Sequence, residues 1–414
     1  MSYIDELGTA AKAAEAKMTL VGTKDKNAAL KAISEALLNN KELIIKENKR
    51  DIENAKINGM TESLIDRLTL TEARIDGMSE GVLQVMALKD PIGEIIGGEE
   101  LPNGLCIEQK RVPLGVIGII FESRPNVTVD AAVLCLKAGN VCILRGGSDA
   151  IYSNKCLIKL MREAIASKGL PEDAIQLVVD TSRPVANELM KADKYIDVLI
   201  PRGGGGLIRS VMQNSTIPVI QTGEGNCHVY IDRFADIDMA VNIVDNAKTQ
   251  RPSVCNAIEN VLVHKDVAEQ FYTALNKKWN GKVKIFGDET CGKFMEMQGT
   301  ATEEEYAKEF LDYAIAVKTV NSIDEAIAHI NKYGTKHSEC IVTINHDNAV
   351  KFQRLVDAAA VYVNASTRFT DGFEFGLGAE IGISTQKLHA RGPMGLKALT
   401  TYKYLISGNG QIRN

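Results

Sequence analysis

A single cysteine in a polar turn is the residue best suited to act as a nucleophile. Cys255 lies in the segment RPSVCNA (251–257), between a helix-like stretch (236–249) and a strand-like one (258–264). Free cysteine is among the most buried residue types, so its place among turn residues is unusual. The thiolate is the attacking form, and a cation such as Arg251 beside it favours that form. We therefore weigh nucleophilic catalysis by Cys255 against a half-buried cysteine without a role.

Four consecutive glycines (203–206) open a predicted helix directly after a predicted strand. Backbone N–H groups at such a helix start, unobstructed by side chains, form a site for anions. A run of four glycines also has a high cost in conformational entropy, which favours contact with a phosphate over a merely flexible turn. The pattern is not the GxGxxG dinucleotide fingerprint. Gly203, Gly204 and Gly205 are nevertheless our candidate cofactor residues.

A second candidate nucleotide site follows the predicted strand 141–144. Arg145, Gly146 and Ser148 lie at its carboxyl end, and residues 137–148 contain no acid. In a dinucleotide-binding sheet, a carboxylate here favours a free ribose 2′-hydroxyl, whereas a cation favours a 2′-phosphate. The charge pattern therefore favours NADP if a nicotinamide nucleotide binds, and a solvated loop is the equal alternative.

Other kinds of site find little support. The six histidines offer no metal set, because His329, His337 and His346 are too widely spaced for one helical face and no HExxH or CxxC motif occurs. We therefore expect no metal. The absence of a GxSxG elbow argues against a serine hydrolase. Arg124 and Arg391 are candidate clamps for carboxylate or phosphate, because a guanidinium presents paired donors. A surface ion pair is the alternative for each of these arginines.

The composition is that of an ordinary globular protein. The 414 residues are 45% hydrophobic and 24% charged, with a net charge of −5, and they include eight cysteines without a CxxC pair. The length predicts two or more domains, and the acidic balance argues against nucleic-acid binding. No apolar run approaches the roughly 18 residues of a membrane span, and no signal peptide pattern occurs. The cysteine usage is typical of reduced thiols, so we expect a cytoplasmic protein.

The hydrophobic pattern predicts helices up to about residue 89 and an alternation of buried strands and helices afterwards. A first βα series covers residues 116–220, ending with a strand at 217–220, and a second covers 228–363. We interpret the polar stretch 285–312 as a surface excursion. Continuously apolar strands that alternate with helices predict an α/β fold with two doubly wound parallel sheets. An extended arm near 104–112 would leave unpaired strand edges in a monomer, as would the strand-like tail, so we expect at least a dimer.

Together these segments resemble the glutamate-5-semialdehyde dehydrogenases, also called γ-glutamyl phosphate reductases, within the aldehyde dehydrogenase superfamily. The matching stretches are PLGVIGIIFESRPNVT (113–128), KAGN (137–140), PRGG (201–204), CNA (255–257), GIS (382–384), HARGPMGL (389–396) and TYKY (401–404). The N-terminal helices are also similar to those of the family. The resemblance implies an NADP-binding domain (1–225) with the arm, a catalytic domain (226–365), and a return segment with an oligomerisation tail (366–414).

Residue roles follow from the same resemblance. Cys255 matches the nucleophile, residues 145–148 match the part that meets the adenosine ribose, and residues 203–206 match the turn beside the dinucleotide phosphates. The backbone N–H of Cys255, with a nearby Asn, would hold the oxyanion, and Asn126 is the candidate for that Asn. Arg251, Arg391 and Arg124 are candidates for binding the substrate.

One departure from the superfamily concerns the base that hydrolyses a thioester. Oxidising aldehyde dehydrogenases carry a Glu there, whereas Thr222 stands at the matching position and Glu224 is shifted. A reductase that ends by hydride transfer does not need this base. The resemblance thus implies NADPH-dependent reduction of L-glutamyl 5-phosphate to L-glutamate 5-semialdehyde, through a cysteine thioester, in proline biosynthesis. A coenzyme-A-acylating aldehyde dehydrogenase and a non-catalytic scaffold are the alternatives, and contact with the preceding glutamate 5-kinase stays open.

Overall fold

The computed structural model describes residues 2–122 and 124–413, so Ser123 of the quoted family stretch lies outside the described residues. The chain divides into two compact units. Unit 1 comprises Met1–Gln221, Gly376–Gly382 and Met394–Asn414, and unit 2 comprises Thr222–Phe375 and Ile383–Pro393. The first division therefore precedes the expected boundary at 225. The expected return segment is shared between the units, because residues 383–393 pair with the start of unit 2.

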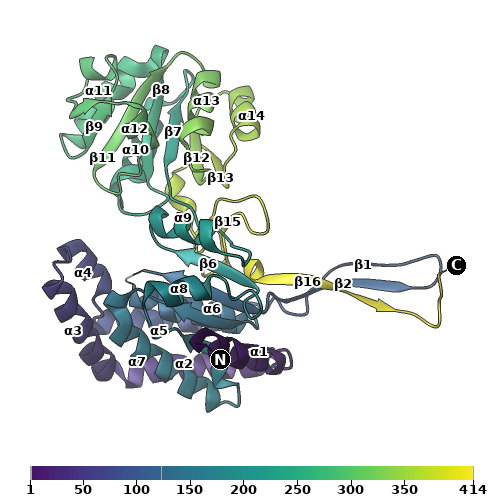
Figure 1. Cartoon of the computed structure of the whole chain (residues 1–414). Helices are drawn as coiled ribbons and strands as arrows, with labels where there is room; N and C mark the ends of the chain where they lie inside the picture. The colour runs from purple at the N-terminus through teal and green to yellow at the C-terminus, as the bar shows by residue number, and fades with distance from the viewer. Residues whose placement is uncertain (1, 123, 414) are drawn as a thin grey trace. The chain divides into compact units, whose positions relative to one another are not determined.

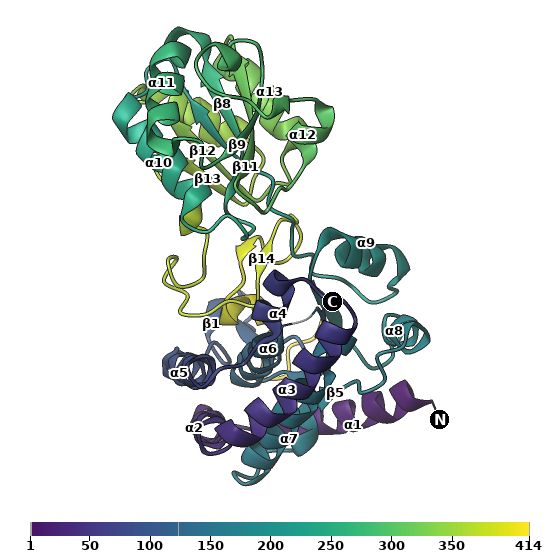
Figure 2. The same cartoon turned by 90° about the vertical axis from the view of Figure 1, so that its left-hand side faces the viewer.

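Unit 1 begins with five helices, as the apolar pattern predicted. They are α1 (Tyr3–Met18), α2 (Thr23–Asn39), α3 (Lys41–Ile57), α4 (Glu62–Leu68) and α5 (Glu72–Ala87). Ser2 starts α1 with a capping box, since its hydroxyl accepts the N–H of Asp5 and the Asp5 carboxylate accepts the N–H of Ser2. Helices α2, α3 and α5 pack on α6 (Pro125–Lys137) and α7 (Ile151–Ala166), as Figure 2 shows.

The core of unit 1 is a parallel sheet in the order β5-β4-β3-β6. Its strands are β3 (Val116–Phe121), β4 (Val141–Arg145), β5 (Ile175–Leu177) and β6 (Val198–Arg202), followed by α8 (Arg183–Leu189) and α9 (Gly205–Asn214) where the chain leaves β5 and β6. Every residue of β3 is buried. The strand expected at 217–220 is absent, and Val219 forms only an isolated bridge with Leu199. Pro218 lacks the N–H that a ladder needs, which explains this difference.

An arm of three antiparallel strands extends from the body of unit 1 (Figure 1). Strand β2 (Cys106–Pro113) is its centre, with β1 (Ile95–Glu100) on one side and β16 (Thr400–Ser407) on the other. The first residue of β16 pairs with the last of β2. Strand β1 escaped prediction because its sequence, IIGGEE, does not alternate between apolar and polar residues.

Unit 2 contains a seven-stranded parallel sheet in the order β10-β9-β11-β8-β7-β12-β13. Its strands are β7 (Cys227–Ile231), β8 (Ile258–His264), β9 (Lys284–Gly287), β10 (Gly299–Thr300), β11 (Ala314–Val320), β12 (Ser338–Val342) and β13 (Ala360–Val363). Its helices are α10 (Ile237–Thr249), α11 (Ala268–Trp279), α12 (Glu303–Ala307), α13 (Ile323–Tyr333) and α14 (His346–Leu355). The interpretation of 285–312 as a surface excursion was wrong, because β9 and β10 extend the sheet here.

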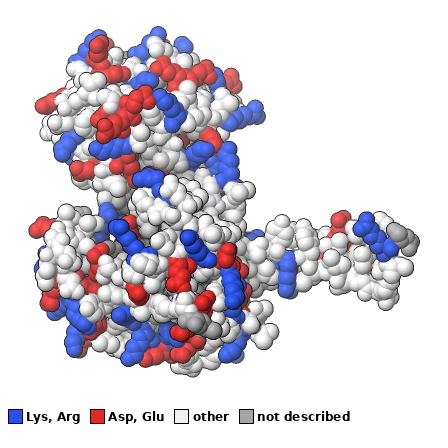
Figure 3. Space-filling view, viewed as in Figure 1, with Lys and Arg blue, Asp and Glu red and all other residues white. Residues whose placement is uncertain are grey.

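The face of each unit that Figure 3 shows carries both signs of charge. In the view of Figure 3, basic and acidic side chains are interspersed over each unit. Among the described residues, no helix has the length and apolar composition needed to cross a membrane.

Candidate active site around Cys255

Cys255 lies in the loop that connects the end of α10 to β8 in unit 2. The N–H of Ala257 donates to the carbonyl of Val254 at 3.0 Å, which turns the chain around the cysteine. The Cys255 side chain is partly exposed, whereas the cysteines of the two parallel sheets are buried and Cys106 of the arm is exposed. An accessible sulfur in a tight turn is what a nucleophile requires.

Gly225 lies directly beneath the backbone of Cys255. A Cβ atom at position 225 would stand 1.5 Å from the Cys255 carbonyl oxygen, so only glycine fits. The N–H of Gly225 donates to Oε1 of Glu309 at 2.8 Å, which fixes this strip of backbone from the other side. Burial raises the pKa of Glu309. Glu309 was not foreseen from the sequence, because it comes from the segment interpreted as a surface excursion.

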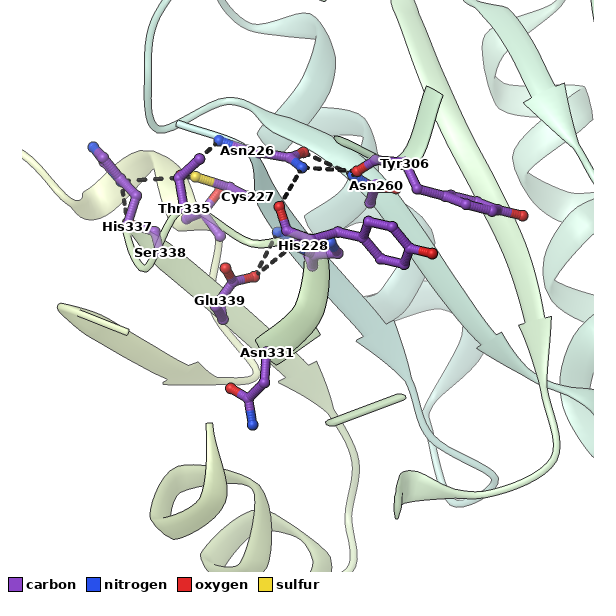
Figure 4. Close-up of polar contacts among 12 residues, drawn as sticks. Asn226, Cys227, His228, Asn260, Tyr306, Asn331, Thr335, His337, Ser338 and Glu339 are labelled. Carbon is purple, nitrogen blue, oxygen red and sulfur yellow. Dashed lines mark hydrogen bonds and ion pairs between the residues drawn. The ribbon is translucent and has the colours of Figure 1, made fainter. Parts of the chain in front are cut away.

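A buried thiol holds the carbonyl of Cys255. The Sγ–H of Cys227 donates to this oxygen at 3.2 Å, and Nδ1 of His337 lies 3.7 Å from the same sulfur. Nδ1 of His337 is also 2.8 Å from Oγ of Ser338 (Figure 4). Burial raises the pKa of Cys227 well above its usual range, so the thiol keeps its proton and remains a donor.

Further buried polar contacts secure the start of β7, from which Cys227 projects (Figure 4). Nδ2 of Asn226 donates to the carbonyl oxygens of Tyr306 and Tyr333 at 2.8 and 2.9 Å. Both the N–H and Nδ1 of His228 meet Oε2 of Glu339, at 2.8 and 2.9 Å. Burial raises the pKa of Glu339 and lowers that of His228, which favours the uncharged form of each side chain.

The far side of the loop is held by the segment that follows β13. Oγ1 of Thr367 donates to the carbonyl of Asn256 at 2.7 Å, and Nδ2 of Asn256 donates to the carbonyls of Thr370 and Arg368 at 2.9 and 3.3 Å. The amide of Asn256 is thus engaged with backbone, although this residue is the neighbour of Cys255. Its role in the structure is to fix the loop.

Two arginines accompany this loop. Arg251 is exposed, and Arg368 is half-buried with its Nε donating to Oε1 of Gln250 at 2.8 Å. Burial lowers the pKa of Arg368, the charge of Arg251 lowers it further, and Cys255 opposes both effects. Sequence reasoning missed Arg368. Its position shortly after β13 could have indicated a binding residue, because ligands bind beyond the carboxyl ends of parallel strands.

Arg391, a predicted substrate clamp, has a partner within unit 2. Its Nη2 lies 2.7 Å from Oδ1 of Asp357, and Lys387 and Lys336 lie 3.1 and 3.4 Å from the other oxygen. Arg391 and the other cations lower the pKa of Asp357 to about 2. Arg391 therefore forms the ion pair that was the alternative to a substrate clamp.

The predicted ribose site lies in unit 1 at the carboxyl end of β4. Nη2 of Arg145 donates to the carbonyl of Thr181 at 2.7 Å, and its Nε is buried without a partner among the described residues. A Cβ at Gly146 would stand 2.3 Å from the Asn154 amide and 3.1 Å from the Phe121 ring, so a side chain here would displace Asn154. Ser148 follows at the start of a single 3-10 turn. An unpaired buried donor beside a glycine fits a nucleotide phosphate or ribose.

The charge argument for this site needs a correction. Asp180, which follows β5, is near enough for its charge to raise the pKa of Arg145 against the lowering by burial. Residues 137–148 lack an acid, but the neighbouring strand supplies one. The spacing could not reveal this, because the two segments are adjacent only in the sheet.

The glycine turn follows β6, as expected, and Gly204 is the N-cap of α9. Its N–H donates to Oε2 of Glu122 at 3.1 Å, and a Cβ at Gly203 would meet the same carboxyl group. Side chains at Gly204 and Gly206 would meet nothing within 4 Å, so this helix start is open on the outside. Gly205 is the first residue of α9. The turn therefore binds an anion in this structure, namely the carboxylate of Glu122.

The remaining predicted residues belong to α6. Arg124 is the N-cap of this helix, and Nδ2 of Asn126 donates to Oδ2 of Asp130 at 3.2 Å. Asn126 belongs to unit 1 and Cys255 to unit 2. Within the described part of the chain, no three His, Cys, Asp or Glu side chains are grouped so that they could hold a metal.

Comparison with known proteins gives the family. The model of the aldehyde dehydrogenase family matches residues 2–313. A gamma-glutamyl phosphate reductase of Clostridium novyi (strain NT) is 58% identical over 413 residues, which are 100% of this chain and 99% of that protein. The crystal structure of gamma-glutamyl phosphate reductase from Thermotoga maritima is 46% identical, with a TM-score of 0.97 and 100% of both chains covered.

A more distant structure extends the similarity of fold. An acetylating aldehyde dehydrogenase from Geobacillus thermoglucosidasius is 17% identical, with a TM-score of 0.72 and 99% of this chain and 97% of that chain covered. The predicted aldehyde-dehydrogenase-like α/β fold is thereby confirmed. With its fold and its full-length relatives in agreement, the chain belongs to the gamma-glutamyl phosphate reductases of the aldehyde dehydrogenase family.

Proposed function

We propose that this chain reduces L-glutamyl 5-phosphate to L-glutamate 5-semialdehyde with NADPH, through a thioester on Cys255. The observation that carries the proposal is the Cys255 loop, in which an accessible sulfur stands on a backbone fixed by Gly225 and Cys227. The names of the relatives supply the substrate. The reaction would be a step in the biosynthesis of proline.

The first step is acyl transfer to sulfur. The Cys255 thiol loses its proton, the sulfur bonds to the acyl carbon, and the bond between that carbon and the phosphate oxygen breaks. Phosphate leaves with the proton, so that a thioester and hydrogen phosphate result. A donor that stabilises the tetrahedral oxyanion contributes about 3 kcal/mol to such a step, and the N–H of Cys255 with Asn126 is our proposal for this function.

The second step needs a nicotinamide nucleotide, which supplies the hydride that reduces the thioester to the aldehyde and frees the sulfur. Arg145, Gly146 and Ser148 would hold its adenosine ribose, and the unpaired Nε of Arg145 supports this assignment. Gly203, Gly204 and Gly205 would lie along its phosphates. There the carboxylate of Glu122 would have to leave the N–H of Gly204.

Hydrolysis of the thioester has no base in the position that oxidising relatives use. Thr222 is buried and forms an antiparallel bridge with Ser384, and the N–H of Gly223 donates to the carbonyl of Ile383 at 3.2 Å. A threonine hydroxyl does not deprotonate water near neutral pH. This supports a thioester that is not hydrolysed and persists until a hydride reduces it.

The test is the reverse assay, in which NADP⁺ is reduced in the presence of glutamate 5-semialdehyde. We expect a rate that depends on inorganic phosphate and does not respond to coenzyme A. Cys255→Ser should abolish this rate and retain NADPH binding. Reduction that requires coenzyme A and ignores phosphate would establish the acylating alternative. A Cys255 that reacts with a thiol reagent no faster than the other seven cysteines would favour the scaffold alternative.

A further inference from the structure

Arg368 contacts the Cys255 loop from the segment that follows β13, and no role for it was predicted from the sequence. We propose that Arg368, together with Arg251, binds the phosphoryl group of the acyl phosphate beside Cys255 and holds it as it leaves. This inference rests on the proposed function and names the group that recognises its leaving anion. It replaces Arg391, which has its own carboxylate partner in Asp357.

The position of Arg368 is set by contacts at both ends of the Cys255 loop. Its Nε donates to Oε1 of Gln250, directly before Arg251, at 2.8 Å. Its carbonyl accepts from Nδ2 of Asn256, directly after Cys255, at 3.3 Å. Arg368 is therefore hydrogen-bonded to both ends of the loop that carries the sulfur, and Gln250 orients the plane of its guanidinium group.

The positive charges beside Cys255 have no ion-pair partner, because neither Arg251 nor Arg368 forms an ion pair in the described ranges 2–122 and 124–413. Burial and the charge of Arg251 lower the pKa of Arg368, while Cys255 and the carboxylate of Asp371, which forms no salt bridge with it, raise that pKa. An exposed cation next to a half-buried guanidinium is unfavourable unless an anion joins them. A dianionic phosphoryl group and a thiolate are the anions that the proposed reaction brings there.

The chemistry of the guanidinium suits this task. Because Nε is bonded to Gln250, the two terminal nitrogens of Arg368 remain for bidentate contact with phosphate oxygens. Negative charge grows on the phosphate as its bond to the acyl carbon breaks, so a cation there stabilises the transition state. The same cation favours the thiolate of Cys255 before the substrate arrives.

The first experiment measures the reverse reaction of the full chain with Arg368→Gln and Arg368→Lys. We expect Arg368→Gln to raise the KM for inorganic phosphate roughly 10- to 100-fold, with Lys restoring part of the loss. The KM for the semialdehyde should not change. Arg354→Gln, an exposed arginine of α14 in the same unit, is the matched control. An unchanged KM for phosphate would overturn the proposal, and a raised KM for the semialdehyde alone would assign Arg368 to the substrate carboxylate instead.

The second experiment does not depend on turnover. Inorganic phosphate should protect Cys255 of the wild type from alkylation by iodoacetamide, compared with chloride at equal ionic strength. This protection should be lost in Arg368→Gln and retained in the Arg354→Gln control. Equal protection of wild type and Arg368→Gln refutes the role of Arg368 even if the reductase activity is present. Absence of activity with protection that depends on Arg368 refutes the proposed function and leaves the anion site standing.

Discussion

The thiol of Cys227 donates a hydrogen bond to the carbonyl of Cys255 over 3.2 Å. One cysteine of the chain thus supports another, and the two differ in chemical state. Cys227 is fully buried and stays protonated, whereas Cys255 is partly exposed. The relationship makes β7 the platform for the nucleophile, since Cys227 is its first residue.

Removal of the Cys227 thiol should therefore disturb the position of Cys255, although Cys255 itself is not substituted. In Cys227→Ala the buried carbonyl of Cys255 loses its donor, which we expect to cost about 1–3 kcal/mol in the free energy of unfolding and to lower kcat. Cys227→Ser retains a donor and should recover most of both quantities. Urea unfolding and the reverse assay measure them. If Ser is as damaging as Ala, the hydrogen bond has no part in positioning Cys255.

Gly225→Ala tests the close approach beneath Cys255. The new methyl group would stand 1.5 Å from the Cys255 carbonyl oxygen, so the backbone of the loop must move. We expect loss of turnover together with a slower reaction of Cys255 with iodoacetamide. Gly77→Ala in α5 is the control, because its Cβ would meet nothing within 4 Å. An active Gly225→Ala enzyme would show that the loop does not need this backbone position.

Buried histidines should make the fold sensitive to acid. Burial lowers the pKa of His337 to about 4 and that of His329 to about 3, from 6.5. Because the folded pKa lies below the unfolded one, the unfolded chain binds the proton first as the pH falls below 6.5. Each histidine then lowers the unfolding free energy by about 1.4 kcal/mol per pH unit, until the folded pKa is reached.

This pH dependence is measured by urea unfolding of the wild type and of His337→Asn. Other groups titrate in the same range, so the difference between the two proteins is the informative quantity. Between pH 6.5 and pH 5 the wild type should lose about 2 kcal/mol more than the variant. Parallel pH profiles would mean that His337 titrates normally in the folded state.

Arg145→Gln tests the preference for NADPH. If Arg145 meets the ribose 2′-phosphate, the variant should lose most of the selectivity for NADPH over NADH, through a higher KM for NADPH. Lys159→Gln, an exposed cation of α7, controls for the change in net charge. Because Asp180 acts on Arg145, Asp180→Asn should shift selectivity further toward NADPH. Equal selectivity in wild type and Arg145→Gln would remove Arg145 from the cofactor site.

The arm predicts an oligomer. Tyr402, Tyr404 and Ile406 of β16 are 49%, 59% and 62% exposed, and the outer edges of β1 and β16 have no neighbouring strand among the described residues. Such apolar edges are typical of strands that pair with another chain. We expect light scattering to give at least twice the 45.1 kDa mass of the chain, and Ile406→Asp to reduce it. A monomer at micromolar concentration would contradict this.

Local patterns were sufficient for much of the fold. Continuous apolar runs predicted buried strands such as Val116–Phe121 and Ile258–His264. The helical period of the apolar residues predicted the N-terminal helices. Short or glycine-rich strands such as β1 and β9 were missed, because they contain too few residues to show an alternation of apolar and polar side chains. The apolar run 217–220 does not form a strand with a ladder of hydrogen bonds, because Pro218 lacks an N–H.

The site was only partly predictable for a different reason. Cys255 stood out because a cysteine in a polar turn breaks the usual preference for burial. Arg368, Cys227 and Glu309 each look ordinary in their own segments. Their importance arises from contacts with the 225–256 region across long sequence separations, of the kind that only a folded sheet reveals.

Acylation of Cys255 can be observed by peptide mass spectrometry of the enzyme after incubation with glutamyl phosphate, generated in situ without NADPH, and an acid quench. A glutamyl adduct should form on the peptide that contains Cys255, disappear when NADPH is added and be absent in Cys255→Ser. An enzyme that turns over without this adduct, or that carries it on another residue, does not use a thioester on Cys255.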